Sequence, residues 1–382
     1  MMRLALVTTV LATGCAAPDP GELFNAMDVA ITDGADVEAR FIDAVGSAST
    51  SLHVALPDVD DTALLESIGA AWDNGLEVQL VVDRDQDAPA LQSLFDIGVP
   101  ITLASDDVTY FDFALDSGSG RDVGWSSDQA IQSHAYVIVD RQRIVTATTA
   151  GHERTGDRVV FELRGEELVE DWLVEHNQIF GGIDASALTA FSSPAKSIAD
   201  FRWRYGTGTA TDLEVWFGPQ ERITKRVIDA VYSAKSRIWV MTDDFANEGL
   251  FAALRAKHDW GFEVRVINGP NIGTSSSALG RAYDTELAPV ERRERLEVEE
   301  VPTVVLVDPE VDNNGFATAS WVLVLSHDLY SSARLYRGVE IQTDQLIDGA
   351  LLVLSNRTDD DRDEIDRFVS FFEERFETGV PR

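Results

Sequence analysis

The sequence predicts an α/β protein of two similar sheet domains, each flanked by helices and related to the other by a pseudo-twofold axis. The first observation is an internal repeat, because residues 42–82 align with residues 228–268 without a gap. A period of this length is too long for a solenoid and indicates a duplicated domain. The second observation is that helical and strand spacings of apolar residues alternate in both copies. That order is typical of a sheet covered by helices.

Four elements are expected in the first copy. Residues 36–48 carry apolar side chains at helical spacing, and residues 51–56 alternate as in a strand. A second helix is expected over residues 62–74, with Gly75 as its stop. Residues 78–82 form a mostly apolar run that suits a strand buried on both faces. The second copy repeats these elements over residues 224–234, 237–241, 249–259 and 263–267.

This arrangement resembles the phospholipase D-like superfamily in its two-copy form. The resemblance rests on Ala48-Ser49-Thr50-Ser51-Leu52, on the run from Gly75 to Asp83, and on Trp216-Phe217-Gly218-Pro219. It covers most of the chain, from about Gly21 to Phe376. The resemblance implies two phospholipase D-like copies that meet at a cleft.

The family's catalytic motif is His-x-Lys, four residues, Asp, and later Gly-Ser-x-Asn. The resemblance implies that one histidine attacks phosphorus, the other protonates the leaving oxygen, and the lysines and asparagines stabilise negative charge. The first copy departs from this motif. Ser133 stands at the histidine position and Ala135 at the lysine position, whereas Asp140 keeps the aspartate and Thr148 keeps a hydroxyl at the serine position.

The second copy is degenerate in the same way. Val301 stands at the histidine position, Thr303 at the lysine position, and Asp308 keeps the aspartate. In the later motif Ser326 keeps the serine and Asp328 replaces the asparagine. We expect the two retained motif aspartates to persist in structural roles, as hydrogen-bond acceptors near the strand ends.

The conclusion that the motif lysines are missing holds whichever way the motif is aligned. The lysines of the chain are Lys196, Lys225, Lys235 and Lys257, so neither copy can supply a motif lysine in any register. Stabilisation of developing negative charge is usually the largest catalytic contribution. The sequence therefore predicts a catalytically silent protein that binds an envelope ligand or protein at the cleft. Neither a cofactor nor a metal is expected.

A second hypothesis is a phosphodiesterase of the phospholipase D type that uses displaced histidines. His134 lies one residue from the motif position, and His327 lies within the later motif of the second copy. His152 could reach the rim of the cleft. A shift of one residue places a strand side chain on the opposite face of the sheet, so we interpret His134 as a half-exposed strand histidine.

The amino-terminal segment resembles a bacterial lipoprotein signal. A short basic start and an apolar core over residues 4–11 precede Cys15, the only cysteine of the chain. The core is too short to span a bilayer. The resemblance implies a cleaved signal over residues 1–14, a lipid anchor on Cys15 and a tether over residues 15–20. Ala16 indicates sorting to the outer membrane of the bacterial envelope, facing the periplasm or the surface; a plain secretory peptide is the alternative.

Net charge and chain length bear on the expected partners and on the domain organisation. The formal net charge of −35 repels nucleic acid and anionic lipid at long range, so nucleic acid is not an expected partner. The chain of 382 residues, 45% of them hydrophobic, is long enough for two globular domains. We expect the first copy over residues 21–190, a connection over 191–210 and the second copy over 211–382.

Overall fold

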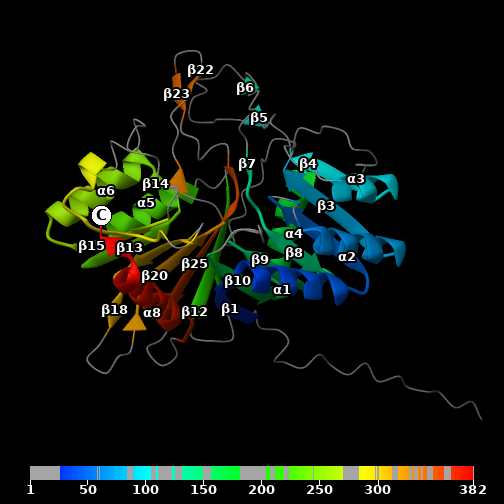
Figure 1. Ribbon diagram of the computed structural model, residues 1–382, viewed down its shortest axis with the longest axis horizontal. Helices are drawn as coiled ribbons and strands as arrows, with labels where there is room; N and C mark the ends of the chain where they lie inside the picture. Colours follow the sequence, from blue (N-terminus) through cyan, green and yellow to red (C-terminus); the bar gives the residue numbers. More distant parts are fainter. Residues whose placement is uncertain are drawn as a thin grey trace, which may run out of the picture.

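The computed structural model contains two mixed sheets flanked by helices, as the sequence predicts. Figure 1 shows the two copies side by side along the long axis of the molecule, with copy one in blue to green and copy two in green to red. The described residues are 26–57, 59, 61–83, 89–104, 109–110, 123–124, 131–148, 156–180, 204–206, 211–218, 223–243, 245–269, 284–296, 298, 301–311, 317–326, 329–330, 334–336, 339–341, 347–356 and 363–381.

The sheet of copy one has the strand order β1-β10-β9-β8-β2-β3-β4. Strands β2, β3 and β4 run parallel to one another, and the other neighbours are antiparallel. The strands and helices of this copy are β1 (Ala26–Asp33), α1 (Gly34–Gly46), β2 (Ser51–Leu56), α2 (Thr62–Asp73), β3 (Glu77–Asp83), α3 (Pro89–Asp96), β4 (Ile101–Ala104), β8 (Tyr136–Val139), β9 (Arg143–Ala147), β10 (Asp157–Arg164) and α4 (Glu166–Phe180).

The sheet of copy two has the order β11-β12-β25-β20-β17-β13-β15-β16-β26. Strand β11 lies within the segment predicted as the connection between the copies and pairs with β12. The elements of this copy are β11 (Arg204–Gly206), β12 (Thr211–Phe217), α5 (Ile223–Ser233), β13 (Arg237–Thr242), α6 (Glu248–Asp259), β15 (Glu263–Asn268), β16 (Glu291–Glu294), β17 (Thr303–Val307), β20 (Trp321–Leu325), β25 (Ala350–Asn356), α8 (Asp363–Thr378) and β26 (Val380–Pro381).

Short two-stranded ladders complete the described structure. They are β5 (Thr109–Tyr110) with β6 (Val123–Gly124), β7 (Ile131–Gln132) with β24 (Ile347–Asp348), β14 (Phe245–Ala246) with β21 (Leu329–Tyr330), β18 (Glu310–Val311) with β19 (Ala317–Thr318), and β22 (Arg334–Tyr336) with β23 (Val339–Ile341).

The predicted repeat is confirmed element by element. The order α1–β2–α2–β3 of copy one returns as α5–β13–α6–β15 in copy two. Strand β2 lies between parallel β3 and antiparallel β8, and β13 lies in the same way between β15 and β17. The two copies therefore share strand register as well as element order.

Corresponding residues begin and end the repeated helices. The Asp61 side chain accepts a hydrogen bond from the backbone of Leu64 at the start of α2, and Asn247 does the same for Leu250 at the start of α6. Such N-caps satisfy backbone N–H groups that have no partner inside the helix. Beyond the helix ends, Gly75 and Gly261 adopt φ angles of 84° and 87°, which favour glycine. The repeat thus preserves the local signals that delimit its helices.

The apolar interior consists of two outer cores and one shared core. In copy one, α1, α2 and α3 cover the outer face of the sheet, and in copy two α5 and α6 do so. The shared core contains side chains from the strands of both sheets and from α4 and α8. The copies are therefore joined by continuous apolar packing.

Polar contacts also cross this seam. The Arg375 guanidinium of α8 donates two hydrogen bonds of 2.8 Å to the carboxylate of Asp157 in copy one. Arg367 donates to the backbone carbonyl of Val29 at 2.8 Å. Strand β7 of copy one pairs in parallel with β24 of copy two, directly before Ser133. Among the described residues, no helix is both long and apolar enough to cross a membrane.

Candidate functional site

The retained motif aspartate of copy one is a hydrogen-bond acceptor for the backbone. Asp140, with a left-handed φ of 51°, follows β8 and accepts bonds of 2.7–3.0 Å from the backbone N–H groups of Ser49, Thr50 and Ser51. Partial burial alone would raise the pKa of Asp140. The hydrogen bonds outweigh burial and hold the pKa well below its usual range.

The aspartate of copy two repeats this arrangement. Asp308 also has a φ of 51° and accepts bonds of 2.7–3.2 Å from the backbone of Lys235, Ser236 and Arg237. Both aspartates therefore fix the start of the central strand of their sheet, in agreement with the structural role expected from the sequence.

The other motif positions of copy one are buried. Ala135 packs in the outer core, and its carbonyl accepts a 3.0 Å bond from the backbone of Ala147. Thr148 and Val159 bond to each other through the Thr148 N–H at 3.0 Å and the Thr148 hydroxyl at 3.2 Å. Ser133 is buried as well. These positions have the surroundings of a packed strand end.

In copy two the corresponding hydroxyls are bonded to neighbouring strands. Val301 is buried in the shared core, and the Thr303 hydroxyl lies 3.0 Å from that of Thr242. The Ser326 hydroxyl accepts a 2.9 Å bond from the backbone of Ala350. His327, Asp328, His152 and Cys15 lie outside the described residues.

The two half-sites differ in polarity at matching positions. Copy one has Leu56 and Val82 at the ends of β2 and β3 beside Ala135, all within an apolar core. Copy two has buried polar side chains at the equivalent ends of β13, β15 and β17, namely Thr242, Asn268 and Thr303. The duplicated site is therefore apolar on one side and hydroxyl- and amide-lined on the other.

His134 does not occupy the half-exposed position expected from the sequence. Its side chain is 1% exposed, and its Nε2 lies 3.1 Å from Oε1 of the buried Glu175. The expectation was wrong because α4, which supplies Glu175, covers this face of the sheet. The side chain of His134 thus faces the shared core rather than solvent.

Sequence reasoning missed that His134 belongs to a buried group of histidines. The rings of His53 and His176 meet edge to face at 5.2 Å, and the Tyr136 hydroxyl lies 3.1 Å from Nδ1 of His176. Burial lowers the pKa of His53 to about 4 and the pKa of His176 well below its usual value. Neutral histidines are therefore built into the inner layer of copy one.

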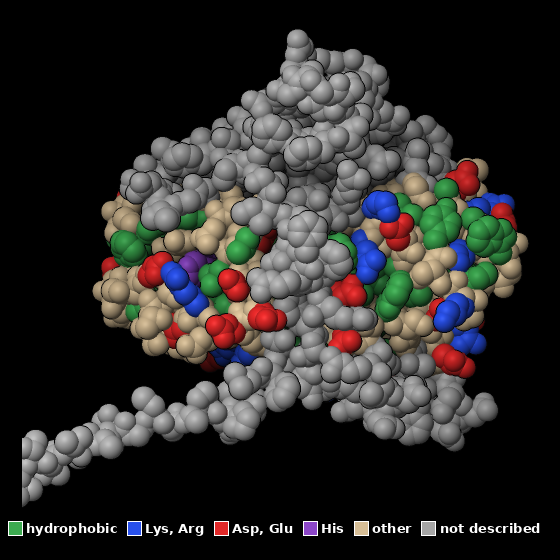
Figure 2. Space-filling view, turned by 180° about the vertical axis from the view of Figure 1, so that it is seen from behind, with side chains coloured by type: hydrophobic (Ala, Val, Ile, Leu, Met, Phe, Trp, Pro, Cys, Tyr) green, Lys and Arg blue, Asp and Glu red, His purple; other side chains and the backbone are tan. Residues whose placement is uncertain are grey.

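Surface charge and potential metal ligands are two further features of the described residues that bear on the site. Acidic and basic side chains of the described residues are interspersed over both copies on the face shown in Figure 2. No group of three or more His, Cys, Asp or Glu side chains among the described residues is placed to hold a metal ion.

The fold is similar to that of solved structures. A phosphatidylserine synthase from Haemophilus influenzae Rd KW20 superposes with a TM-score of 0.63 at 10% identity, covering 95% of this chain and 90% of that one. The chain has the two-domain phospholipase D-like fold. A polyphosphate kinase from Porphyromonas gingivalis gives a TM-score of 0.55 at 10% identity over 92% of this chain and 47% of that one.

The two phospholipase D-like copies can also be compared with a shorter protein. The phospholipase D family member Nuc from Salmonella typhimurium matches over 45% of this chain and 98% of its own length, with 16% identity and a TM-score of 0.34. No protein-family model matches the sequence, and no curated protein matches it.

Proposed function

We propose that this protein is a catalytically silent phospholipase D-like protein that binds a ligand or partner at the cleft between its copies. The fold supports a function of phospholipase D or phosphodiesterase type. The main observation in favour of a catalytically silent protein is the kind of side chain at the two motif lysine positions. Ala135 and Thr303 stand there, and neither side chain can place a positive charge against a phosphoryl oxygen.

The surroundings of these residues support the same proposal. Ala135 is packed in an apolar core, and the Thr303 hydroxyl bonds to Thr242. Ala135 therefore faces away from the other copy and offers no charge to the cleft, and a phosphate group buried there without a fixed cation would be strongly unfavourable. The half-site of copy two keeps buried hydroxyl and amide groups where copy one is apolar, and among its described residues it too contains no cation.

The second candidate is a phosphodiesterase that uses His134 and His327. One observation favours it, because the Nε2 of His134 lies 3.1 Å from the Glu175 carboxylate, and a carboxylate that orients a histidine is a common feature of general bases. Burial opposes it, because His134 is covered on the face where Glu175 meets it. A substrate would reach this nitrogen only after α4 had moved.

The test is hydrolysis of bis(p-nitrophenyl) phosphate and of phosphatidylcholine vesicles by the full chain. We expect no turnover above background in the wild type. The decisive variant is His134→Ala, and the matched control is His258→Ala on α6. Turnover that disappears in His134→Ala but persists in the control would contradict the silent proposal and establish the displaced-histidine enzyme.

The proposed location is the bacterial cell envelope, with the membrane contacted through a lipid on Cys15. The small residues that precede this single cysteine support the proposal. Two or more acyl chains would make the anchor stable. Metabolic labelling with a fatty acid should mark the wild type and fail to mark Cys15→Ala. Equal labelling of both proteins would exclude the anchor.

A further inference from the structure

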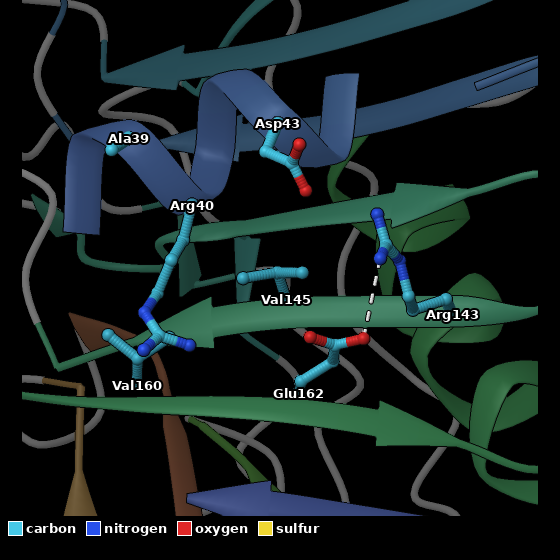
Figure 3. Close-up of a pocket in the computed structure, with 7 residues that line it drawn as sticks. All are labelled: Ala39, Arg40, Asp43, Arg143, Val145, Val160 and Glu162. Carbon is cyan, nitrogen blue, oxygen red and sulfur yellow. Dashed lines mark hydrogen bonds and ion pairs between the residues drawn. The ribbon is translucent and has the colours of Figure 1, made fainter. Parts of the chain in front are cut away.

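Copy one contains a cavity on its outer face, between α1 and strands β9 and β10. Its volume is about 230 Å³, below the range of drug-sized ligand sites, roughly 300–1,000 Å³. Figure 3 shows the Arg40 guanidinium and the Asp43 carboxylate extending from α1 over a floor formed by Val145. The lining residues are Ala39, Arg40, Asp43, Arg143, Val145, Val160 and Glu162.

In copy two, aromatic side chains occupy the same place. Trp216 of β12 and Trp321 of β20 pack against the outer core there. The guanidinium of Arg226 on α5 lies 4.7 Å from the ring centroid of Trp216 and 6.0 Å from that of Trp321. Both distances are within the range of attraction between a cation and an aromatic ring. Copy two thus shows what this site accepts when it is filled.

The counterparts of these residues explain why copy one is open. The offset of the repeat continues back along the same helix and pairs Arg226 of α5 with Arg40 of α1. Trp321 begins the strand opposite the end of β17, and Arg143 begins the strand opposite the end of β8. Trp216 on β12 pairs with Leu351 on β25, and at the equivalent place in copy one Ala30 on β1 pairs with Val160 on β10. Ala30 is therefore the counterpart of Trp216. Two indole rings are therefore replaced by a methyl group and a guanidinium.

At the rim of the cavity, too, copy one has a smaller side chain than copy two. On α5, Lys225 bonds to the Asp229 carboxylate across one helical turn. The counterparts in copy one are Ala39 and Asp43, so the lysine is replaced by a methyl group. Among the described residues, the Asp43 carboxylate has no hydrogen-bond or ion-pair partner. An acceptor at the mouth of the cavity is thus left for a donor from outside the chain.

The other charged groups of the cavity are already paired. Arg143 bonds to Glu162 at 3.3 Å and to the Ser47 hydroxyl at 2.7 Å. Arg40 bonds to Asp36 through Nε at 2.8 Å across one helical turn. Hydrogen bonding with Arg40 lowers the pKa of Asp36, so the pair is ionised near neutral pH. The site therefore combines a guanidinium group, an apolar floor and a carboxylate that has no partner among the described residues.

We propose that this cavity binds a planar aromatic ring that carries an N–H donor, such as an indole. The ring occupies the space that the tryptophans fill in copy two and stacks on the Arg40 guanidinium. Its N–H group donates to the Asp43 carboxylate. The volume of the cavity limits the guest to a single ring system, either of a small molecule or of a tryptophan side chain exposed on a partner protein.

The experiment is a fluorine NMR titration of two probes with the full chain. 5-Fluorotryptophan represents the small molecule, and N-acetyl-5-fluorotryptophan amide represents a side chain within a peptide. We expect saturable line broadening of at least one probe at concentrations up to about 1 mM. Binding of the amide at least as tightly as the amino acid assigns the site to a side chain, and binding of the free amino acid alone assigns it to a small molecule.

Variants with matched controls decide the location. Arg40→Ala and Asp43→Ala should each weaken binding by about fivefold or more, whereas Arg226→Ala and Asp229→Ala in copy two should leave it unchanged. Arg143→Trp, which restores one of the rings found in copy two, should abolish binding. Circular dichroism melting checks that each variant is folded. Failure of both probes to bind, or equal loss in the copy-two controls, would overturn the proposal.

Discussion

The inner layers of the two copies have opposite chemical characters at the same position of the repeat. In copy one His53 faces His176 of α4, and both are buried and neutral. In copy two the counterpart of His53 is Trp239, which stacks on Phe372 of α8 with ring centroids 5.1 Å apart. At this position one copy therefore has a pair of titratable rings and the other a stack of aromatic rings.

This difference shows that the two copies have kept the same order of elements and the same hydrogen bonds at the strand starts, which we call the frame. The side chains packed on that frame have changed. The aspartates that bind the strand starts, Asp140 and Asp308, make nearly the same bonds in both copies. Side chains that fill the inner and outer layers have diverged, and with them the dependence of each copy on pH. The following predictions test whether the two layers behave as differently as their residues indicate.

The largest effect is expected from the aromatic layer. Trp239→Ala should lower the free energy of unfolding by about 3–5 kcal/mol, because it removes a large buried ring and leaves a cavity. The matched change His53→Ala should cost about 1–2 kcal/mol at pH 7, since a smaller ring is lost. Urea denaturation followed by circular dichroism measures both. Equal losses would break the comparison.

The titratable layer should make the protein sensitive to acid. The pKa of His53 falls from 6.5 to about 4 on folding, so the unfolded chain binds the proton first. Stability is therefore retained above pH 6.5 and falls as the pH is lowered towards 4, by about 3 kcal/mol from His53 alone. Urea denaturation at several pH values should show this slope, and it should be shallower in His53→Leu. An unchanged slope in that variant would assign the acid sensitivity to other groups.

The seam should respond to loss of its ion pair. Arg375→Met removes both bonds to Asp157 and leaves the carboxylate partly buried, which should cost about 2 kcal/mol. Arg375→Lys keeps the positive charge but cannot make the two parallel bonds, so its melting temperature should lie between those of the wild type and Arg375→Met. Thermal melting compares the three proteins. A melting temperature for Arg375→Met equal to that of the wild type would show that this ion pair does not stabilise the joined copies.

The smallest differences are expected between the retained aspartates. Asp140→Ala and Asp308→Ala each remove an acceptor for several backbone N–H groups and should each cost about 1–2 kcal/mol. Because the two environments are so alike, the two losses should agree within about 0.5 kcal/mol. Urea denaturation of the paired variants measures this agreement, and a much larger loss on one side would show that the frame has diverged as well.

The frame could be predicted from the sequence because its signals are local. The repeated helices and strands follow from apolar spacing, and their ends follow from Asp61, Asn247 and the two glycines that stop α2 and α6. The role of the motif aspartates followed from the resemblance, and their hydrogen bonds agree with it.

The buried histidines and the outer cavity could not be predicted in this way. His53 and His176 are far apart in the sequence, and each has ordinary spacing within its own element. Only the packing of α4 on the sheet brings them together and covers His134. The cavity depends on substitutions spread over two strands and a helix, at Ala30, Arg143 and Ala39. Within the repeated helix, the replacement of Lys225 by Ala39 was a sequence signal that could have indicated it.

The hydrogen bond between Arg367 and Val29 has a consequence for the order of synthesis. Val29 leaves the ribosome early, and its partner follows only after most of the chain has been made. Contacts so distant in sequence form late in folding. Until α8 arrives, apolar surface of the shared core remains uncovered, and such surface attracts chaperones or leads to aggregation. A chain interrupted before α8 is therefore expected to be recovered in the insoluble fraction rather than as a folded single copy.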